Sequence, residues 1–137
     1  HILPEITSYI GSFGILATDN PLESYFESLE KTLNLDVTLV LPGHRAPLSD
    51  HRDRIQQLVA HHRQRLEDIV EILDRENRLS AWEVAARMRW DYTGPWDSFP
   101  AKQKWFATSE ALAHLVFLLN KGAVKSEKRG QVIVFER

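Results

Sequence analysis

The apolar residues of this chain recur at helical spacing in several separate stretches. Asp19 or Asn20 can cap a helix with Pro21 in its first turn. The apolar side chains that follow return every three or four positions and predict this helix over about 21–34. A longer stripe of the same spacing predicts a second helix over about 51–77. The chain is therefore predicted to be mostly helical.

A short β-branched and apolar run, 36–41, separates these two helices. Pro42 and Gly43 end it, which is the pattern of a buried strand that leads into a tight turn. His44 follows at once, and ligand sites of layered α/β folds are commonly built at the ends of strands. Residues 1–18 predict a loop with one short strand.

The last part of the chain predicts a second helical unit that ends in a hairpin. Ser80 and Glu83 have the spacing of a capping box, and a turn-rich connection follows them. Another amphipathic helix precedes two short strands at about 123–126 and 131–135. Helix, connection, helix and hairpin in this order is the outline of a winged helix. Four large aromatic residues are expected to fill the core of this unit, namely Trp82, Trp90, Trp96 and Trp105.

Composition limits the chemistry that this chain can carry. A 43% apolar and 26% charged composition is typical of a soluble globular protein. The absence of cysteine excludes disulfides, thiolate zinc sites and a cysteine nucleophile, so His, Asp and Glu are the strong metal ligands that remain. No apolar run approaches the roughly 20 residues that span a bilayer, so no membrane association is expected. A cytoplasmic protein fits this composition best.

Residues 20–44 resemble the helix, strand and histidine turn near the end of metallo-β-lactamase-fold hydrolases, by the order of these elements more than by any one residue. The stretches His61–Arg65, 111–115 and 122–124 are similar to the winged-helix extension of the branch that resembles β-lactamase-like protein 2. This resemblance implies an α+β, mostly helical fold. Residues 1–49 would be the C-terminal remnant of the αββα catalytic domain, and residues 50–137 a long linking helix plus a winged-helix domain. The charge is divided along the chain, with −5 over residues 1–79 and +3 over 80–137, which also favours two units.

The same resemblance implies a metal site. Such hydrolases hold two metal ions, usually zinc, and His44 is the one residue of this chain that matches a ligand of the family. A bare Pro-Gly-His turn would favour a histidine without a ligand role, but the preceding helix and strand reverse that expectation. The start of the chain, His1 to Thr7, looks like the segment that directly follows the family's bridging Asp. The chain is therefore expected to be a C-terminal fragment that is inactive alone, because a zinc site needs at least three protein ligands.

Four residues are candidates for the rim of the substrate site: Arg45, His61, Arg63 and Arg65. Arg45 replaces the Gly that is more common in the resembled family, and simple pairing with Asp50 is favoured over contact with an acidic substrate. His62 lies on the apolar stripe of its helix and is expected in the core or an interface.

Three functional hypotheses stay open. The first is a hydrolase of a small-molecule ester or thioester, or of RNA. The second is a winged-helix module that binds nucleic acid or protein, with Lys125, Lys128 and Arg129 contacting phosphates. Sequence-specific DNA binding is not expected, because the exposed face predicted for the last helix is a poor reader of bases; it comprises Ser109, Glu110, Ala113, His114 and Asn120. The third is a homodimer formed through the helix over about 51–77.

Overall fold

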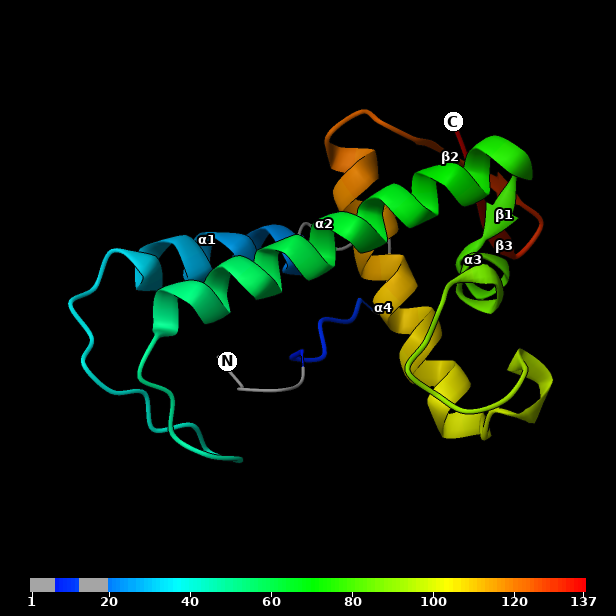
Figure 1. Ribbon diagram of the computed structural model, residues 1–137. Helices are drawn as coiled ribbons and strands as arrows, with labels where there is room; N and C mark the ends of the chain where they lie inside the picture. The colour runs from blue at the N-terminus through cyan, green and yellow to red at the C-terminus, as the bar shows by residue number, and fades with distance from the viewer. Residues whose placement is uncertain (1–6, 13–19) are drawn as a thin grey trace.

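The computed structural model describes residues 7–12 and 20–137 (Figure 1). Long helices dominate it, so the expectation of a mixed, mostly helical fold is confirmed. In chain order the elements are α1 (Pro21–Leu33), α2 (His51–Arg75), β1 (Leu79–Ser80), α3 (Ala81–Arg87), the 3-10 turn η1 (Trp96–Ser98), α4 (Ala101–Asn120), β2 (Lys125–Arg129) and β3 (Val132–Glu136).

Helix α1 forms where the spacing of apolar residues predicts it. Asn20 caps it, with its side chain accepting a hydrogen bond from the Glu23 amide, and Pro21 occupies the first turn, where its missing N–H costs nothing. The buried face consists of Leu22, Tyr25 and Leu29, which pack against α2. Helix α1 therefore shares a core with the longer helix instead of standing alone.

Helix α2 connects two hydrophobic cores, which lie towards its two ends. Asp50 caps it by accepting a hydrogen bond from the Asp53 amide at 2.9 Å. Near its start, Ile55 and Leu58 join the cluster under α1, whereas Ile69 and Leu73 near its end join the larger cluster with α3, α4 and the sheet. The helix predicted over about 51–77 is thus one continuous element (Figure 1).

The C-terminal part is a small sheet packed against α3 and α4. Its strand order is β1-β3-β2, with both pairs antiparallel, and Phe135 of the central strand is fully buried. The predicted capping box is present, since the Ser80 hydroxyl accepts from the Glu83 amide and the Glu83 carboxylate accepts from the Ser80 amide. The predicted hairpin is formed by β2 and β3, but β2 lies two to three residues later than the strand predicted over about 123–126, and β1 has no counterpart among the predicted elements.

The strand predicted over 36–41 is not formed. Within the described chain these residues make only an isolated antiparallel bridge, between Val40 and Leu48. Leu39 and Leu41 are exposed by 53% and 75%, where the prediction had a buried strand. A strand needs a neighbour for its backbone N–H and C=O groups, and the described residues offer this segment no sheet. Residues 7–12 contain no strand either, and the rest of the short strand predicted within 1–18 lies outside the described residues.

The core-filling role predicted for the tryptophans is wrong for two of the four. Trp90 and Trp96 pack against the C-terminal core, but Trp82 and Trp105 are 48% and 51% exposed. The smaller Val84 and Ala85 occupy the buried face of the short helix α3 instead. The exposed aromatic surface of this end is therefore larger than the sequence suggests.

Candidate functional site

The predicted metal ligand, His44, lies on an exposed turn between α1 and α2. Two backbone hydrogen bonds close the base of this loop, from Val40 N to Leu48 O at 2.8 Å and from Leu48 N to Val40 O at 3.1 Å. The next residue, Arg45, has φ of 73°, in the left-handed region that favours glycine. The turn therefore has a backbone shape that Gly adopts more easily than Arg, which matches the residue more common in the resembled family.

No metal site is complete in the part of the chain that the structure describes. Among residues 7–12 and 20–137, no group of three or more His, Asp or Glu side chains could hold a metal ion. His44 is one imidazole, whereas zinc sites use three or four protein ligands. The described residues do not fit a zinc pair by themselves.

The other candidate residues lie further along α2 and form a different cluster. His61 is ten residues past the start of this helix at His51, about 15 Å along its axis. None of the hydrogen bonds or ion pairs that His61, Arg63 and Arg65 make within the described chain reaches His44. The structure thus separates the histidine turn from the three rim candidates of α2, and Arg45 stays beside His44 on the turn.

A buried pair of histidines joins α2 to α4. His62 and His114 are both fully buried, and His62 Nδ1 lies 3.1 Å from His114 Nε2. His114 Nδ1 is 2.8 Å from the carbonyl oxygen of Glu110, which can only accept, so this nitrogen carries the proton and donates. In a neutral ring His114 Nε2 then accepts from His62 Nδ1.

This order of protons leaves His62 Nε2 as an acceptor. It is one of two buried side-chain atoms without a hydrogen-bond partner among the described residues; the other is Nε2 of His51. Tyr25 and Phe26 of α1 stand edge-on to the His62 ring, with centroids 5.5 and 6.0 Å away. The His62 ring therefore contacts His114 through Nδ1, and the aromatic rings of α1 flank it as well.

Burial keeps both imidazoles neutral. Desolvation lowers the pKa of His62 from about 6.5 to about 3, helped by the neighbouring His114 and His61. Desolvation also lowers the pKa of His114 to about 4, and the hydrogen bond to the Glu110 carbonyl opposes it. Neither ring is a good proton acceptor at neutral pH, so the pair serves as a structural contact between helices.

Arg65 lies at the edge of this cluster, and its guanidinium already forms an ion pair with Glu110. Its Nε donates to His61 Nε2 at 3.0 Å and lies 3.2 Å from a Glu110 carboxylate oxygen, with both side chains largely buried. The guanidinium also lies 4.5 Å from the centroid of the Trp90 ring. Burial raises the pKa of Glu110, and the Arg65 charge opposes that rise. Sequence reasoning missed Glu110 and Trp90 as partners, although the four-residue spacings His61–Arg65 and Glu110–His114 place each pair on one helix face.

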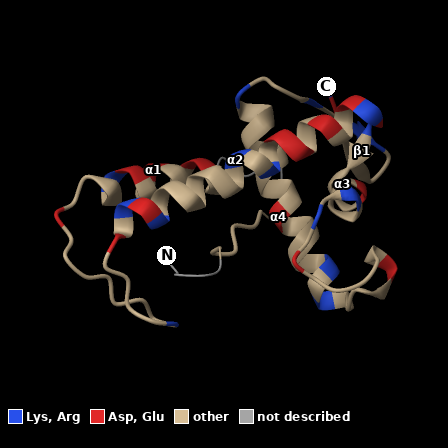
Figure 2. Cartoon of the chain, viewed as in Figure 1, with Lys and Arg blue, Asp and Glu red and all other residues tan. Residues whose placement is uncertain are grey.

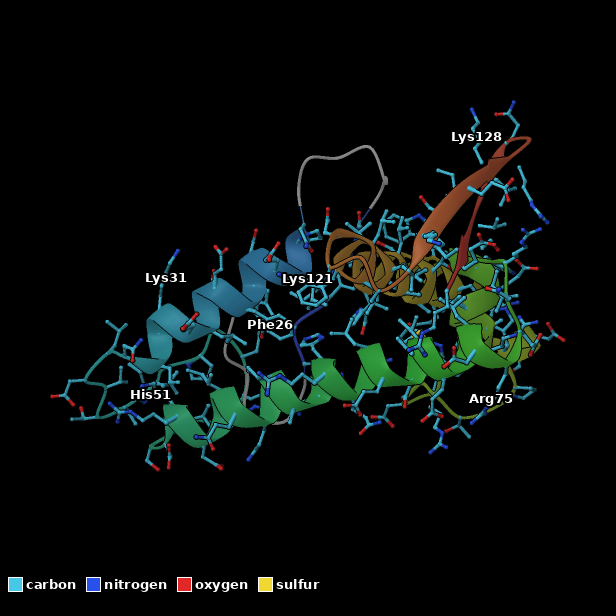
Figure 3. All side chains as sticks on the ribbon, turned by 90° about the horizontal axis from the view of Figure 1, so that it is seen from above. Phe26, Lys31, His51, Arg75, Lys121 and Lys128 are labelled. Atoms are coloured by element: carbon cyan, nitrogen blue, oxygen red, sulfur yellow. The ribbon has the colours of Figure 1, made fainter. Side chains whose placement is uncertain are left out.

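Arg63 is exposed and lines an apolar groove along α1 and α2. The groove has a volume of about 770 Å³, and Phe26 lies between the two helices (Figure 3). Val59 and Phe117 contribute further apolar surface, and Glu30 lies with Arg63 among the charged lining residues. Charges of both signs are distributed along α2 (Figure 2).

The basic residues predicted to contact phosphates lie on strand β2. Lys125, Lys128 and Arg129 are all exposed, and Lys128 projects from the hairpin (Figure 3). Because side chains alternate along a strand, Lys125 and Arg129 share one face with Glu127, while Lys128 lies on the other. Arg129 Nε is 3.3 Å from the Glu127 carboxylate. The positive charges of the hairpin are therefore divided between its two faces.

The face of α4 predicted to be exposed is mostly buried. Ser109, Ala113 and His114 are at most 5% exposed, because this face packs against residues 8–12, α1 and α2. The Ser109 hydroxyl donates to the carbonyl of Ser12 at 3.0 Å, and the Ser12 amide donates to the carbonyl of Ser109 at 3.0 Å. The prediction failed because it assigned one buried face to a helix that is covered on several sides.

No described helix is long and apolar enough to cross a membrane.

Comparison with known proteins finds relatives along almost the whole chain, although no family model matches it. The chain is 30% identical over 119 residues to the probable metallo-hydrolase YqjP of Bacillus subtilis, which covers 85% of this chain and 34% of that protein. Among solved structures, a β-lactamase domain protein from Burkholderia ambifaria is 33% identical with a TM-score of 0.84. The metallo-β-lactamase family protein TTHA1429 from Thermus thermophilus is 29% identical with a TM-score of 0.77.

Both structural matches cover 99% of this chain and 39% of the matched chain. The chain thus spans between a third and two fifths of the length of these relatives.

Proposed function

Because the chain is homologous along its length to proteins of the metallo-β-lactamase fold, we propose that it forms the C-terminal part of a metal-dependent hydrolase. The observation that carries this proposal is the TM-score of 0.84 at 33% identity over 99% of the chain. Its relatives are more than twice as long, so the activity would belong to a longer protein. In that protein His44 would hold one of two metal ions, and zinc is the metal that the resemblance implies.

The exposed turn supports the role proposed for His44. Imidazole is a good zinc ligand, and the His44 ring follows a β-like segment at a loop whose base is closed by the Val40 and Leu48 backbone bonds. Bound zinc would supply Lewis-acid chemistry and lower the pKa of a coordinated water towards 7. The described residues supply only one of the ligands needed, so the remaining ligands would come from other parts of the longer protein.

Residues 36–41 support the same proposal, because they lack a paired neighbouring strand and a cover for their apolar side chains. Their sequence is that of a buried strand, yet Leu39 and Leu41 are exposed on one face and Val40 alone forms a bridge within the described chain. Covering two such side chains would stabilise the fold by about 1.5–3 kcal/mol each. A neighbouring strand from the longer hydrolase would pair this backbone and bury both leucines.

The C-terminal unit would form a wall of the substrate groove. We assign residues 50–137 to a linking helix and a winged-helix domain, supported by the order β1, α3, α4, β2, β3 and the sheet order β1-β3-β2. Arg45 and Arg63 are the rim candidates with exposed side chains, whereas Arg65 is held by Glu110. The substrate would be an ester, a thioester or RNA, and a homodimer through α2 is compatible with its exposed face.

Metal content of a longer form of the protein tests this proposal. The protein would be expressed with its upstream sequence, and bound zinc would be counted by plasma mass spectrometry. We expect two zinc ions per chain in the wild type and fewer in His44→Ala, with hydrolysis of a generic ester or phosphodiester lost in parallel.

His61→Ala is the matched control, because it removes an imidazole that lies about 15 Å along α2 from the start of the helix and is not proposed as a ligand. It should keep both zinc ions. Equal metal content in His44→Ala and the wild type would contradict the proposal. The 137-residue chain alone, supplied with zinc, should show no hydrolysis above the protein-free background.

A second candidate function is a nucleic-acid or protein binding module. The exposed Lys125, Lys128 and Arg129 favour it, whereas the burial of α4 removes the usual groove-reading face. Titration with labelled single- and double-stranded RNA and DNA at about 50 and about 200 mM salt would test it, since phosphate binding weakens steeply with salt. Binding that is lost in a Lys125, Lys128 and Arg129 to Gln triple variant would support this module.

A further inference from the structure

A second pocket lies at the opposite end of the molecule from the His44 turn. The connection between α3 and α4, residues 88–100, folds back on itself far from the loop between α1 and α2 (Figure 1). It encloses a pocket of about 400 Å³, which is within the range of about 300–1,000 Å³ typical of ligand sites. Aromatic rings form much of its lining, together with one charged residue, Arg89.

Local hydrogen bonds fix the walls of this pocket. Gly94 has φ of 118°, which only glycine adopts readily, and the turn that follows is closed by the Ser98 amide and hydroxyl, both donating to the Pro95 carbonyl at 2.9 and 2.7 Å. Phe99 is buried and packs against Trp96 and Tyr92, with ring centroids 5.3 and 4.3 Å apart. The aromatic walls are therefore held in place before any ligand arrives.

The surface of this pocket remains accessible. Tyr92 is 41% exposed, and Trp82, which is 48% exposed, extends the aromatic surface by contacting Trp96 edge-on at 5.2 Å. Trp90 presents another ring to the pocket, and its indole N–H is fixed to the Ala85 carbonyl at 2.7 Å. Among the rings that line the pocket, Tyr92 is the one most open to a ligand, because Phe99 is buried and the rings of Trp90 and Trp96 already lie beside Arg65 and Lys104.

Arg89 differs from the other arginines nearby. Arg87 pairs with Glu76 at 2.6 Å and Arg75 pairs with Glu71 at 3.0 Å, whereas no described residue makes a hydrogen bond or ion pair with the exposed Arg89 side chain. Asp91 and Asp97 lie on the same connection, but neither lines the pocket. The pocket therefore offers the exposed ring of Tyr92 together with a guanidinium that no described residue pairs.

We propose that this pocket binds a nucleotide, with its base stacked on the exposed ring of Tyr92 and its phosphate held by Arg89. Every nucleobase has a planar face that stacks on aromatic side chains, and a guanidinium binds phosphate oxygens in a fork. A quaternary ammonium ligand would use the rings equally well, but the Arg89 charge would repel it. Neither a metal ion nor His44 takes part, so a test of this site does not depend on whether the hydrolase proposal is correct.

Titration of the 137-residue chain with adenosine 5′-monophosphate tests the proposal. Binding would be followed by isothermal titration calorimetry and by the tryptophan indole resonances in NMR spectra. We expect saturable binding, with adenosine about tenfold weaker because it lacks the phosphate. Ribose 5-phosphate should be about fivefold or more weaker because it cannot stack. A five-residue oligoadenylate compared with the mononucleotide distinguishes a site for free nucleotide from one for a nucleotide within a strand.

Two variants and two controls locate the site. Arg89→Gln and Tyr92→Leu change exposed side chains and should weaken nucleotide binding by about tenfold and about fivefold. Arg75→Gln and Trp105→Leu alter an exposed arginine and an exposed tryptophan outside the pocket and should leave nucleotide binding unchanged. Circular dichroism confirms that each variant is folded. No saturable binding by the wild type, or equal loss in the controls, would overturn the proposal.

Discussion

The two ends of α2 differ in how completely the rest of the chain covers them. At the C-terminal end, Leu73 joins a core in which Phe135 and Leu115 are fully buried, and the three-stranded sheet is paired along β3 on both sides. At the N-terminal end, α1 packs on α2 through Leu22 and Leu29, but the following segment forms a single bridge and exposes its leucines.

This difference separates what the chain can stabilise alone from what needs another surface. Residues within 69–137 bury the core of the C-terminal end and pair both sides of its central strand, although Trp82 and Trp105 stay exposed. The segment 36–48 is paired only by the Val40–Leu48 bridge and exposes Leu39 and Leu41, and it is the segment that carries the candidate metal ligand His44. An element that is strand-like in sequence but unpaired indicates that a partner strand is needed.

The largest effect is expected from breaking the complete end. Phe135→Ala removes a fully buried ring in the central strand and should lower the free energy of unfolding by about 3–5 kcal/mol, measured by urea denaturation. Val132→Ala is the matched control on the same strand, where the side chain is 51% exposed, and should change stability by less than about 0.5 kcal/mol. Similar losses from both variants would contradict the core assigned to β3.

Acid should loosen the contact between the two regions. His62 and His114 have folded-state pKa values of about 3 and about 4, below their ordinary value of about 6.5, so the unfolded chain binds more protons between these values. Their neutral forms stabilise the fold fully above about pH 6.5, and that stability is lost as the pH falls. At about pH 5 the loss should be about 2 kcal/mol for each histidine.

Other groups in the cluster modify this pH dependence. Burial and nearby charges lower the pKa of His61, which acts in the same direction, whereas the raised pKa of Glu110 acts in the opposite one. Urea denaturation at several pH values between about 7 and about 5 measures the sum. The double variant His62→Leu with His114→Leu should show a clearly flatter dependence, and an equal slope in the variant and the wild type would assign the effect elsewhere.

A smaller loss is expected at the start of α3. Ser80→Ala removes the hydroxyl that caps the Glu83 amide and should cost about 1 kcal/mol, measured by urea denaturation. Ser80→Asp should restore most of this stability, because a carboxylate can accept the same hydrogen bond. If Ser80→Ala were neutral, the capping box would contribute nothing to the C-terminal end.

The smallest effect, and the sharpest contrast, is expected at Leu41. In the 137-residue chain this residue is 75% exposed, so Leu41→Ser should change the free energy of unfolding by less than about 0.5 kcal/mol. In a longer protein that buries the segment, the same substitution should cost about 2 kcal/mol or more. Equal effects in both forms would show that nothing covers this leucine.

Most helices could be predicted from the sequence because their signals are local. Apolar spacing after a cap at Asp19 or Asn20 defined α1, apolar spacing defined α2, and the capping box defined the start of α3. The strand over 36–41 was predicted wrongly because strand formation depends on a partner that local sequence does not reveal. The brief strand β1 was missed because Leu79 and Ser80 pair only with residues near the end of the chain.

The site was predicted only in part, for a similar reason. The turn position of His44 follows from Pro42 and Gly43, but its role as a ligand stays a prediction. The buried position of His62 was expected from the apolar stripe, whereas its contact with His114 joins residues 52 positions apart. The sequence did not single out Arg89, because whether an arginine has an ion-pair partner is known only once its neighbours in space are known.

The central claim is that His44 ligates a metal in a longer protein. The most direct measurement is a crystal structure of that longer protein loaded with zinc, in which the distance from the His44 ring to the metal is read. We predict a ring nitrogen at about 2.0–2.1 Å from a zinc ion, with residues 36–41 paired to a neighbouring strand. An imidazole that points away from every bound ion would contradict the claim.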